Sequence, residues 1–139
     1  MMVIVASADI DRLGHVNNAV YLRWVEAAVY GHWLHHALDD ERQRIDWIAV
    51  RHEIDYRLPA FAGDRLRVGV VIEQVRRARA WYRTTITRGP DTIVDALSCW
   101  CAIDPASRRL TVIPDSVASR FLPTGTVPDQ DRIEIKLDV

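Results

Sequence analysis

The longest amphipathic stretch of the chain begins after Asn17. Apolar or small residues recur there at spacings of three and four, at Val20, Trp24, Ala27, Gly31, Leu34 and Leu38, and Tyr21, Val25 and Ala28 widen the stripe. This period is that of one face of an α-helix. The pattern predicts a helix over residues 17–38, buried along one side. Within it, Gly31 removes a side chain where a sheet could approach closely.

Beyond this helix the apolar residues alternate with polar ones, which is typical of strands. We expect residues 39–44 to be a solvated helix end and loop. Strands are predicted at 2–7, 48–56, 66–73, 81–88, 92–103 and 133–137, with a hairpin tip at 76–79, a turn at 89–91 and a short helix at 114–121. The four strands between 48 and 103 are expected to lie as successive antiparallel neighbours.

The segment 92–103 is apolar on both of its alternating sets of residues. Such a strand belongs in a sheet that is covered on two sides. One cover could be the long helix and the other a partner subunit. The order of elements therefore predicts an α+β fold with a helix packed on an antiparallel sheet, in a single domain over residues 1–139.

Composition adds little to this picture but excludes several classes of protein. With 49% hydrophobic and 27% charged residues, a chain of 139 residues can form one globular core. A net charge of −1 argues against nonspecific nucleic-acid binding. The sequence predicts no membrane span and no secretion signal, because its apolar runs are too short. Cys99 and Cys101, two apart in a strand, suit buried reduced thiols and a cytoplasmic protein.

The chemistry is concentrated in residues 9–26, which read DIDRLGHVNNAVYLRWVE. A carboxylate, Asp11, precedes the predicted helix start at Asn17 and Asn18. The first N–H groups of a helix have no partner within the helix, and they can hold developing negative charge. A carboxylate beside such a helix end is suited to the hydrolysis of an activated acyl group.

This run resembles the active-site segment of hotdog-fold acyl-CoA thioesterases of the 4-hydroxybenzoyl-CoA thioesterase superfamily. The resemblance lies in Asp-x-Asp-x-x-Gly-His-Val-Asn-Asn followed by Tyr-x-x-Trp-x-Glu. It implies a hotdog fold, in which an antiparallel sheet wraps around one long central helix. It also implies hydrolysis of acyl-CoA or acyl-carrier-protein thioesters without a cofactor or metal. Asp11 would be the nucleophile or general base, and the Asn18 backbone N–H would bind the thioester oxygen.

The neighbouring motif residues are expected to contact substrate: Gly14, His15, Val16, Asn17 and Tyr21. Some residues of the motif also have a structural alternative. Asp11 could merely cap a turn, Asn17 could cap the helix, and Tyr21 could belong to the core, as we expect of Trp24. Asp9 is expected to be structural. Plant acyl-carrier-protein thioesterases carry an Asn where this chain has Leu13, so their catalytic arrangement is not expected here.

Three further groups of polar residues have weaker signals. Glu26 on the helix is a reserve catalytic carboxylate, although a salt bridge or hydrogen bond is the expected role. The His and Asp residues between 32 and 40 lack a third convergent metal ligand, so a solvated helix end is expected. Arg76, Arg77, Arg79 and Arg83 could meet the phosphates of coenzyme A or simply form an exposed hairpin.

Hotdog subunits usually pair, so the resemblance implies a homodimer or homotetramer. Each site would then combine Asp11 of one chain with residues 52–57 or 65–70 of the other. Two alternatives remain at this point. One is a non-catalytic acyl-thioester-binding protein on the same fold, and the other is a hotdog hydratase or dehydratase, whose motifs differ from this one.

Overall fold

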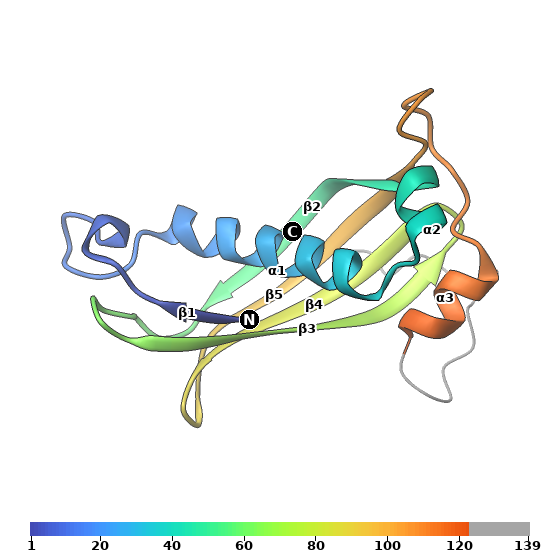
Figure 1. Cartoon of the computed structure of the whole chain (residues 1–139). Helices are drawn as coiled ribbons and strands as arrows, with labels where there is room; N and C mark the ends of the chain where they lie inside the picture. Colours follow the sequence, from blue (N-terminus) through green and yellow to red (C-terminus); the bar gives the residue numbers. More distant parts are fainter. Residues whose placement is uncertain (123–139) are drawn as a thin grey trace.

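The computed structural model of the protein describes residues 1–122. The elements in chain order are β1 (Met2–Ile4), a 3-10 helix η1 (Ser7–Asp9), α1 (Asn18–His36), α2 (Asp39–Arg44), β2 (Asp46–Tyr56), β3 (Arg65–Arg76), β4 (Arg79–Arg88), β5 (Asp91–Ile103) and α3 (Asp115–Phe121). Figure 1 shows α1 lying along a curled sheet, with α2 and α3 near the end of α1. The strand predicted at 133–137 lies outside the described residues.

The five strands form one antiparallel sheet in the order β1-β3-β4-β5-β2. A curled antiparallel sheet with one long helix along it is the hotdog architecture, so the predicted α+β fold is confirmed. The predicted order of the strands was wrong in one respect. β2 pairs with β5, with Tyr56 opposite Val94, and it does not neighbour β3.

Connection length explains this strand order. The turns at 77–78 and 89–90 contain two residues each, so β3–β4 and β4–β5 must be neighbours. Arg77 and Gly89 adopt positive φ angles of 53° and 56° to make these turns. The connection at 57–64 can span about 26 Å when extended, whereas β2 and β3 are roughly 14 Å apart across the sheet. It can therefore carry the chain past β5 and β4.

The buried side of α1 packs on the sheet in two parts. The first half of α1 packs in a cluster at the β1 end of the sheet, and the second half packs in a cluster that includes residues of α3. The buried residues of α1 are Val20, Tyr21, Val25, Ala28, Val29 and Trp33. They meet Leu66, Val68 and Ile86 in one cluster, and Ile72, Val75, Tyr82 and Trp100 in the other. The helix is buried along one side, as predicted, but that side is not the predicted stripe. Ala27, Gly31, Leu34 and Leu38 are exposed, and Val29 and Trp33 are buried instead.

Two local expectations need correction. The first strand ends at Ile4, and Ser7 begins η1, because the Asp9 carboxylate accepts a hydrogen bond from the Ala6 N–H (2.9 Å) and turns the chain. Residues 39–44 form a separate helix rather than a solvated end. Glu41 in α2 is buried, accepts a hydrogen bond from the Leu38 N–H (2.9 Å) and pairs with Arg120 of α3.

The predicted burial of β5 on both faces is confirmed for most of its length. Cys99 and Cys101 are buried and not disulfide-bonded, as expected of structural thiols. Among residues 1–122, no helix is long and apolar enough to span a lipid bilayer.

Candidate active site

The loop between η1 and α1 is held by backbone hydrogen bonds that close it into a compact turn. The Asp11 N–H donates to the His15 carbonyl (2.9 Å), and the Gly14 N–H donates to the Asp11 carbonyl (3.0 Å). Gly14 has a φ of +84°, which a side chain would disfavour. Gly14 therefore supplies a backbone conformation that the turn requires, and its contact with substrate stays a prediction.

Asp11 lies in this turn with its carboxylate partly buried, at 24% exposure. Its Oδ1 accepts a hydrogen bond from the Leu13 N–H (2.8 Å), so Asp11 does cap a turn. Its Oδ2 lies 3.8 Å from Nδ1 of His15. One carboxylate oxygen is therefore fixed by the turn, while the other faces His15 and is available for chemistry.

The start of α1 follows directly. Asn17 is the N-cap, because its Oδ1 accepts a hydrogen bond from the Ala19 N–H (3.0 Å). The capping role weighed for Asn17 is thus confirmed. Asn18 is the first helical residue, and within residues 1–122 its backbone N–H makes no hydrogen bond. A free N–H at a helix start can stabilise an oxyanion.

A groove of about 290 Å³ opens beside this helix start. Its lining residues are His15, Val16, Asn18, Tyr21, Tyr56, Arg57, Leu58 and Pro59. The predicted residues 15, 16, 18 and 21 therefore come together, whereas Asp11 contacts His15 but does not itself line the groove. Val16 and Tyr21 are also buried in the core, so they serve the groove as its inner wall.

Tyr56 is a groove residue that the motif did not indicate. Its hydroxyl donates to the Asn18 carbonyl (3.4 Å), and its ring lies 5.8 Å from that of Tyr21. Burial raises the pKa of both Tyr21 and Tyr56, so each phenol stays protonated and can donate a hydrogen bond at neutral pH. In the sequence, the available signal for Tyr56 was the alternation of residues 48–56. That alternation puts Tyr56 and His52 on the same face of the predicted strand.

The connection 57–64 fixes the groove to the sheet. The N–H groups of Arg57 and Leu58 both donate to the Ile93 carbonyl (2.9 and 3.3 Å), and the Val16 N–H donates to the buried Ala60 carbonyl (2.9 Å). Residues 56–59 therefore reach the site within one chain. The expectation that residues 52–57 or 65–70 of a partner chain complete the site stays a prediction.

Glu26 forms part of a hydrogen-bonded chain farther along α1. Its Oε1 lies 3.1 Å from Nε2 of His52, and Nδ1 of His52 lies 2.7 Å from Oγ of Ser98. The order Ser–His–Glu resembles a hydrolytic triad, but Ser98 is fully buried and cannot meet a substrate. These hydrogen bonds instead link α1, β2 and β5, which confirms the hydrogen-bonding role expected of Glu26.

The arginine cluster lies at the other end of the sheet. Arg79 is opposite Cys101 in β5, whereas Tyr56 beside Asn18 is opposite Val94. Seven residues of strand correspond to roughly 23 Å. Arg83 pairs with Glu73 (2.5 Å) and Asp95 (3.0 Å), and Arg76, Arg77 and Arg79 line a hollow of about 370 Å³. Within one protomer this cluster is too distant to contact a thioester group at Asn18.

Of the histidines near the end of α1, His35 and His36 are exposed as expected, whereas His32 is less exposed than expected. His32 is half-buried against Phe121 (ring centroids 5.6 Å apart), and burial lowers the pKa of His32 to about 4. Asp39 and Asp40 pair with Arg42 and Arg44. In the part of the chain that the structure describes, no three His, Cys, Asp or Glu side chains are arranged to hold a metal ion.

Comparison with known proteins gives a consistent result. The model of the thioesterase-like superfamily matches residues 5–121. A thioesterase from Thermus thermophilus, solved with coenzyme A and Zn, is 27% identical with a TM-score of 0.76, over 87% of this chain and 89% of that one. The probable thioesterase YbaW from Escherichia coli is 24% identical with a TM-score of 0.73, over 86% and 93%.

A third similar structure is Slr0204, a 1,4-dihydroxy-2-naphthoyl-CoA thioesterase from Synechocystis, at 24% identity and a TM-score of 0.71, over 87% of this chain and 93% of that one. No significant match was found among curated protein sequences. The family match covers most of the chain, and the structure has the same fold as these thioesterases. The protein therefore belongs to the thioesterase-like superfamily.

Proposed function

We propose that the protein hydrolyses acyl-CoA thioesters to a free acid and coenzyme A, with Asp11 as nucleophile or general base. Thioester hydrolysis as the class of reaction is supported by the family and the fold. The observation that carries the finer proposal is local. The partly buried Asp11 carboxylate lies 3.8 Å from His15, and His15 lines a groove together with Asn18, whose helix N–H is unpaired within residues 1–122.

In the proposed reaction the thioester carbonyl lies at the first turn of α1, where the Asn18 N–H donates to its oxygen. Asp11 either attacks the carbonyl carbon, giving a mixed anhydride that water then hydrolyses, or removes a proton from the attacking water. In both routes the C–S bond breaks, water supplies the new oxygen of the acid, and the thiolate leaves. Loss of one oxyanion donor typically costs about 3 kcal/mol of transition-state stabilisation.

The comparisons favour coenzyme A over an acyl-carrier protein as the thiol. The Thermus thermophilus thioesterase was solved with coenzyme A, and the Synechocystis protein and gentisyl-coenzyme A thioesterase BH1999 are named for CoA thioesters. Acyl-carrier-protein thioesters are the second substrate class. They would need no arginine contact with the 3′-phosphate of coenzyme A.

The proposed enzyme is a dimer built on the β2 edge of the sheet. β2 pairs with β5 on one side and has no neighbour on the other among residues 1–122. Ile48 and Val50 in β2 are about half exposed, as are Tyr30 and Leu34, which follow Glu26 at four-residue spacing in α1. Pairing two β2 edges around a two-fold axis would bury these side chains.

Such pairing would also bring the arginine cluster of one chain to the site of the other. A two-fold axis at β2 reverses the strand direction, so the partner's hairpin end comes to the end of the sheet where Asn18 lies. Hairpin arginines 76, 77 and 79 of one chain would then meet the phosphates of coenzyme A bound at Asn18 of the other.

A thiol-release assay with a panel of acyl-CoA substrates tests the proposal. Asp11→Asn should lower kcat at least about a hundredfold without changing the fold, because it removes the charged base. Asp9→Asn is the matched control. It loses the same charge two residues away, keeps an oxygen to accept from the Ala6 N–H, and should retain most activity.

Near-normal turnover by Asp11→Asn would remove Asp11 from the mechanism. A wild-type protein that binds acyl-CoA but releases no thiol would instead be a non-catalytic binder, in which Asp11 only caps its turn. Addition of water to an enoyl-CoA without thiol release would identify a hydratase.

A further inference from the structure

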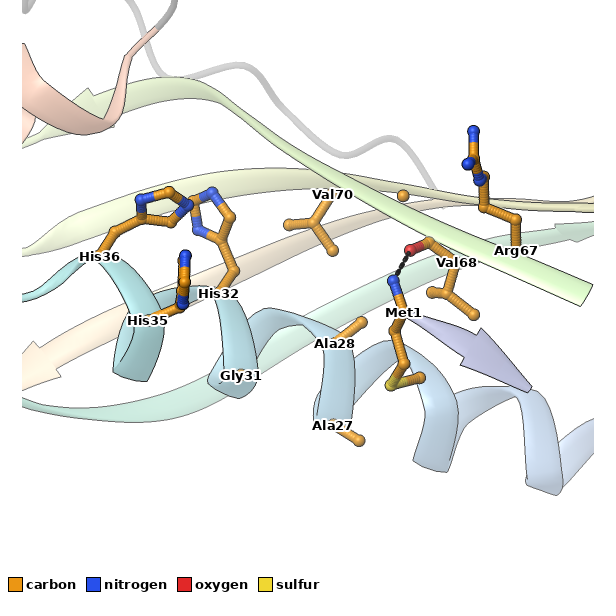
Figure 2. A pocket seen from close by; sticks show the side chains of 11 residues that line it. Met1, Ala27, Ala28, Gly31, His32, His35, His36, Arg67, Val68 and Val70 are labelled. Carbon is orange, nitrogen blue, oxygen red and sulfur yellow. Dashed lines mark hydrogen bonds between the residues drawn. The ribbon is translucent and has the colours of Figure 1, made fainter.

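A second hollow, of about 600 Å³, lies between the second half of α1 and β3 (Figure 2). Its apolar floor consists of Ala27, Ala28 and Gly31 of α1 together with Val68 and Val70 of β3. Gly31 follows Asn18 by thirteen residues, or roughly 20 Å of helix. The hollow also faces the β3 side of the sheet, away from β2. It is therefore separate from the groove of the candidate active site.

Small residues create this space. We expected Gly31 to permit close approach of the sheet, but a Cβ built on Gly31 would meet no atom within 4 Å. Glycine inside a helix costs up to about 1 kcal/mol relative to alanine. The close-packing explanation for Gly31 is thus wrong, and the residue instead leaves a hollow open.

Imidazole groups gather at one end of the hollow. His32, His35 and His36 all line it, and the ring of His36 lies 4.6 Å from that of His32 and 4.8 Å from that of His35. Nδ1 of His32 is buried and has no hydrogen-bond partner within the described chain. Other buried side-chain atoms of the described chain share this property, and a ligand or water in the hollow would supply the partner that Nδ1 of His32 lacks.

The charges of the lining do not oppose an anion. Arg67 lines the hollow at the end opposite the histidines, and Figure 2 shows its guanidinium pointing away from α1. The lining residues in the described part of the chain include no Asp or Glu. Glu26, which precedes Ala27 in the chain, lies 3.1 Å from His52, and Asp39 and Asp40, which follow the histidines, are paired with arginines. Because the lining residues carry no negative charge, they would not repel a carboxylate in the hollow.

The open edge of β3 adds a backbone donor. The Val68 N–H donates to the Met1 carbonyl (2.7 Å), and the Met1 nitrogen donates to the Val68 carbonyl (2.9 Å). In an antiparallel ladder, alternate residues direct both backbone groups to the same side. Val70 therefore presents its N–H at this edge, where no strand among residues 1–122 pairs with it.

We propose that this hollow binds an organic carboxylate with an apolar body, whose carboxylate is held by the histidine N–H groups and whose body covers the floor at Gly31. Its volume lies within the range of about 300–1,000 Å³ found for small-molecule sites. The chemistry fits a free fatty acid or another acid of similar size. The proposal does not depend on the hydrolase activity of the Asp11 site.

Isothermal titration of the full chain with decanoate tests this site, with decanol as the neutral analogue and acetate as the analogue without an apolar body. Decanoate should bind saturably, and both analogues should bind at least tenfold more weakly. Gly31→Leu fills the floor and should weaken decanoate binding at least tenfold while thioester turnover and oligomeric mass stay unchanged. His35→Gln combined with His36→Gln should also weaken binding, whereas His52→Gln, at a distant imidazole, should not.

Several results would overturn the proposal. They are the absence of decanoate binding, equal affinity for decanol, and wild-type affinity in Gly31→Leu. Competition by saturating coenzyme A would assign the binding to the Asp11 groove instead. A change in oligomeric mass on Gly31→Leu would make the hollow an interface between copies of the chain.

Discussion

His32 is a titratable residue held in a partly apolar environment. Its ring contacts those of Tyr82 in β4, His36 in α1 and Phe121 in α3, at centroid distances of 4.6–5.9 Å. Burial, followed by the nearby His36 and His35, lowers the pKa of His32 from 6.5 to about 4. The folded protein therefore keeps this ring neutral over a pH range in which the unfolded chain protonates it.

This pKa predicts an acid-sensitive stability. Between pH 6.5 and about 4 the unfolded state binds a proton at His32 that the folded state does not, so the contribution of His32 to the free energy of unfolding falls as the pH decreases. His32→Phe removes the titrating group and keeps an aromatic ring. Urea unfolding followed by tryptophan fluorescence at pH 7 and pH 5 should show a smaller loss of stability in this variant. His35→Phe is the control, and an equal loss in wild type and His32→Phe would contradict the prediction.

At the level of single residues, the sequence was informative where the contacts are local. The turn around Asp11, the positive φ of Gly14 and the cap at Asn17 all depend on residues within a few positions of one another. Tyr56 was missed because its contact with Asn18 joins residues 38 positions apart. No local pattern specifies that contact, which depends on how β2 ends against α1.

The start of α1 is the element on which the proposed chemistry depends. Asn17→Ala removes the acceptor for the Ala19 N–H, and such losses cost about 1 kcal/mol. Because the Asn18 N–H belongs to the same turn, fraying should also lower turnover. Urea unfolding and thiol release would measure both effects. Asn17→Ser restores a capping oxygen and should recover most of the stability. Wild-type stability in Asn17→Ala would exclude a capping contribution.

The ends of helices were predicted to within a few residues where a capping residue is visible in the sequence. The helix expected at 17–38 spans Asn18–His36, with Asn17 as its cap. Its end was less clear because the Leu38 N–H bonds to Glu41 and begins α2. A single run of charged residues, 39–44, does not reveal that one of them, Glu41, is buried against Arg120. That pairing depends on where α3 packs.

For the whole molecule, helix content and alternating strands predicted the fold class, but not the order of the sheet. Two-residue turns determine their own hairpins, whereas the connection at 57–64 is long enough for several neighbours. The resulting sheet has two different edges. On one side, the part of β3 that extends beyond its pairing with β1 borders the hollow at Gly31, and on the other side the β2 edge carries the exposed residues Ile48 and Val50.

The β2 edge makes a prediction about assembly. Val50 is 53% exposed, and a lysine there would place a charge where a second β2 strand should pair. Val50→Lys should reduce the mass measured by light scattering from a multiple of 15.9 kDa to that of one chain. Turnover should fall at least tenfold, because the proposed site needs the partner's arginine hairpin.

Val71→Lys is the matched control for this variant. Val71 is 50% exposed but lies in β3, away from the β2 edge, so the same substitution should leave mass and turnover unchanged. A wild-type protein that scatters as a single chain would contradict pairing through β2. An unaltered mass in Val50→Lys would place the interface elsewhere. A monomeric Val50→Lys with full turnover would show that Asp11 and Asn18 act within one chain, and the partner's arginines would then have no role in catalysis.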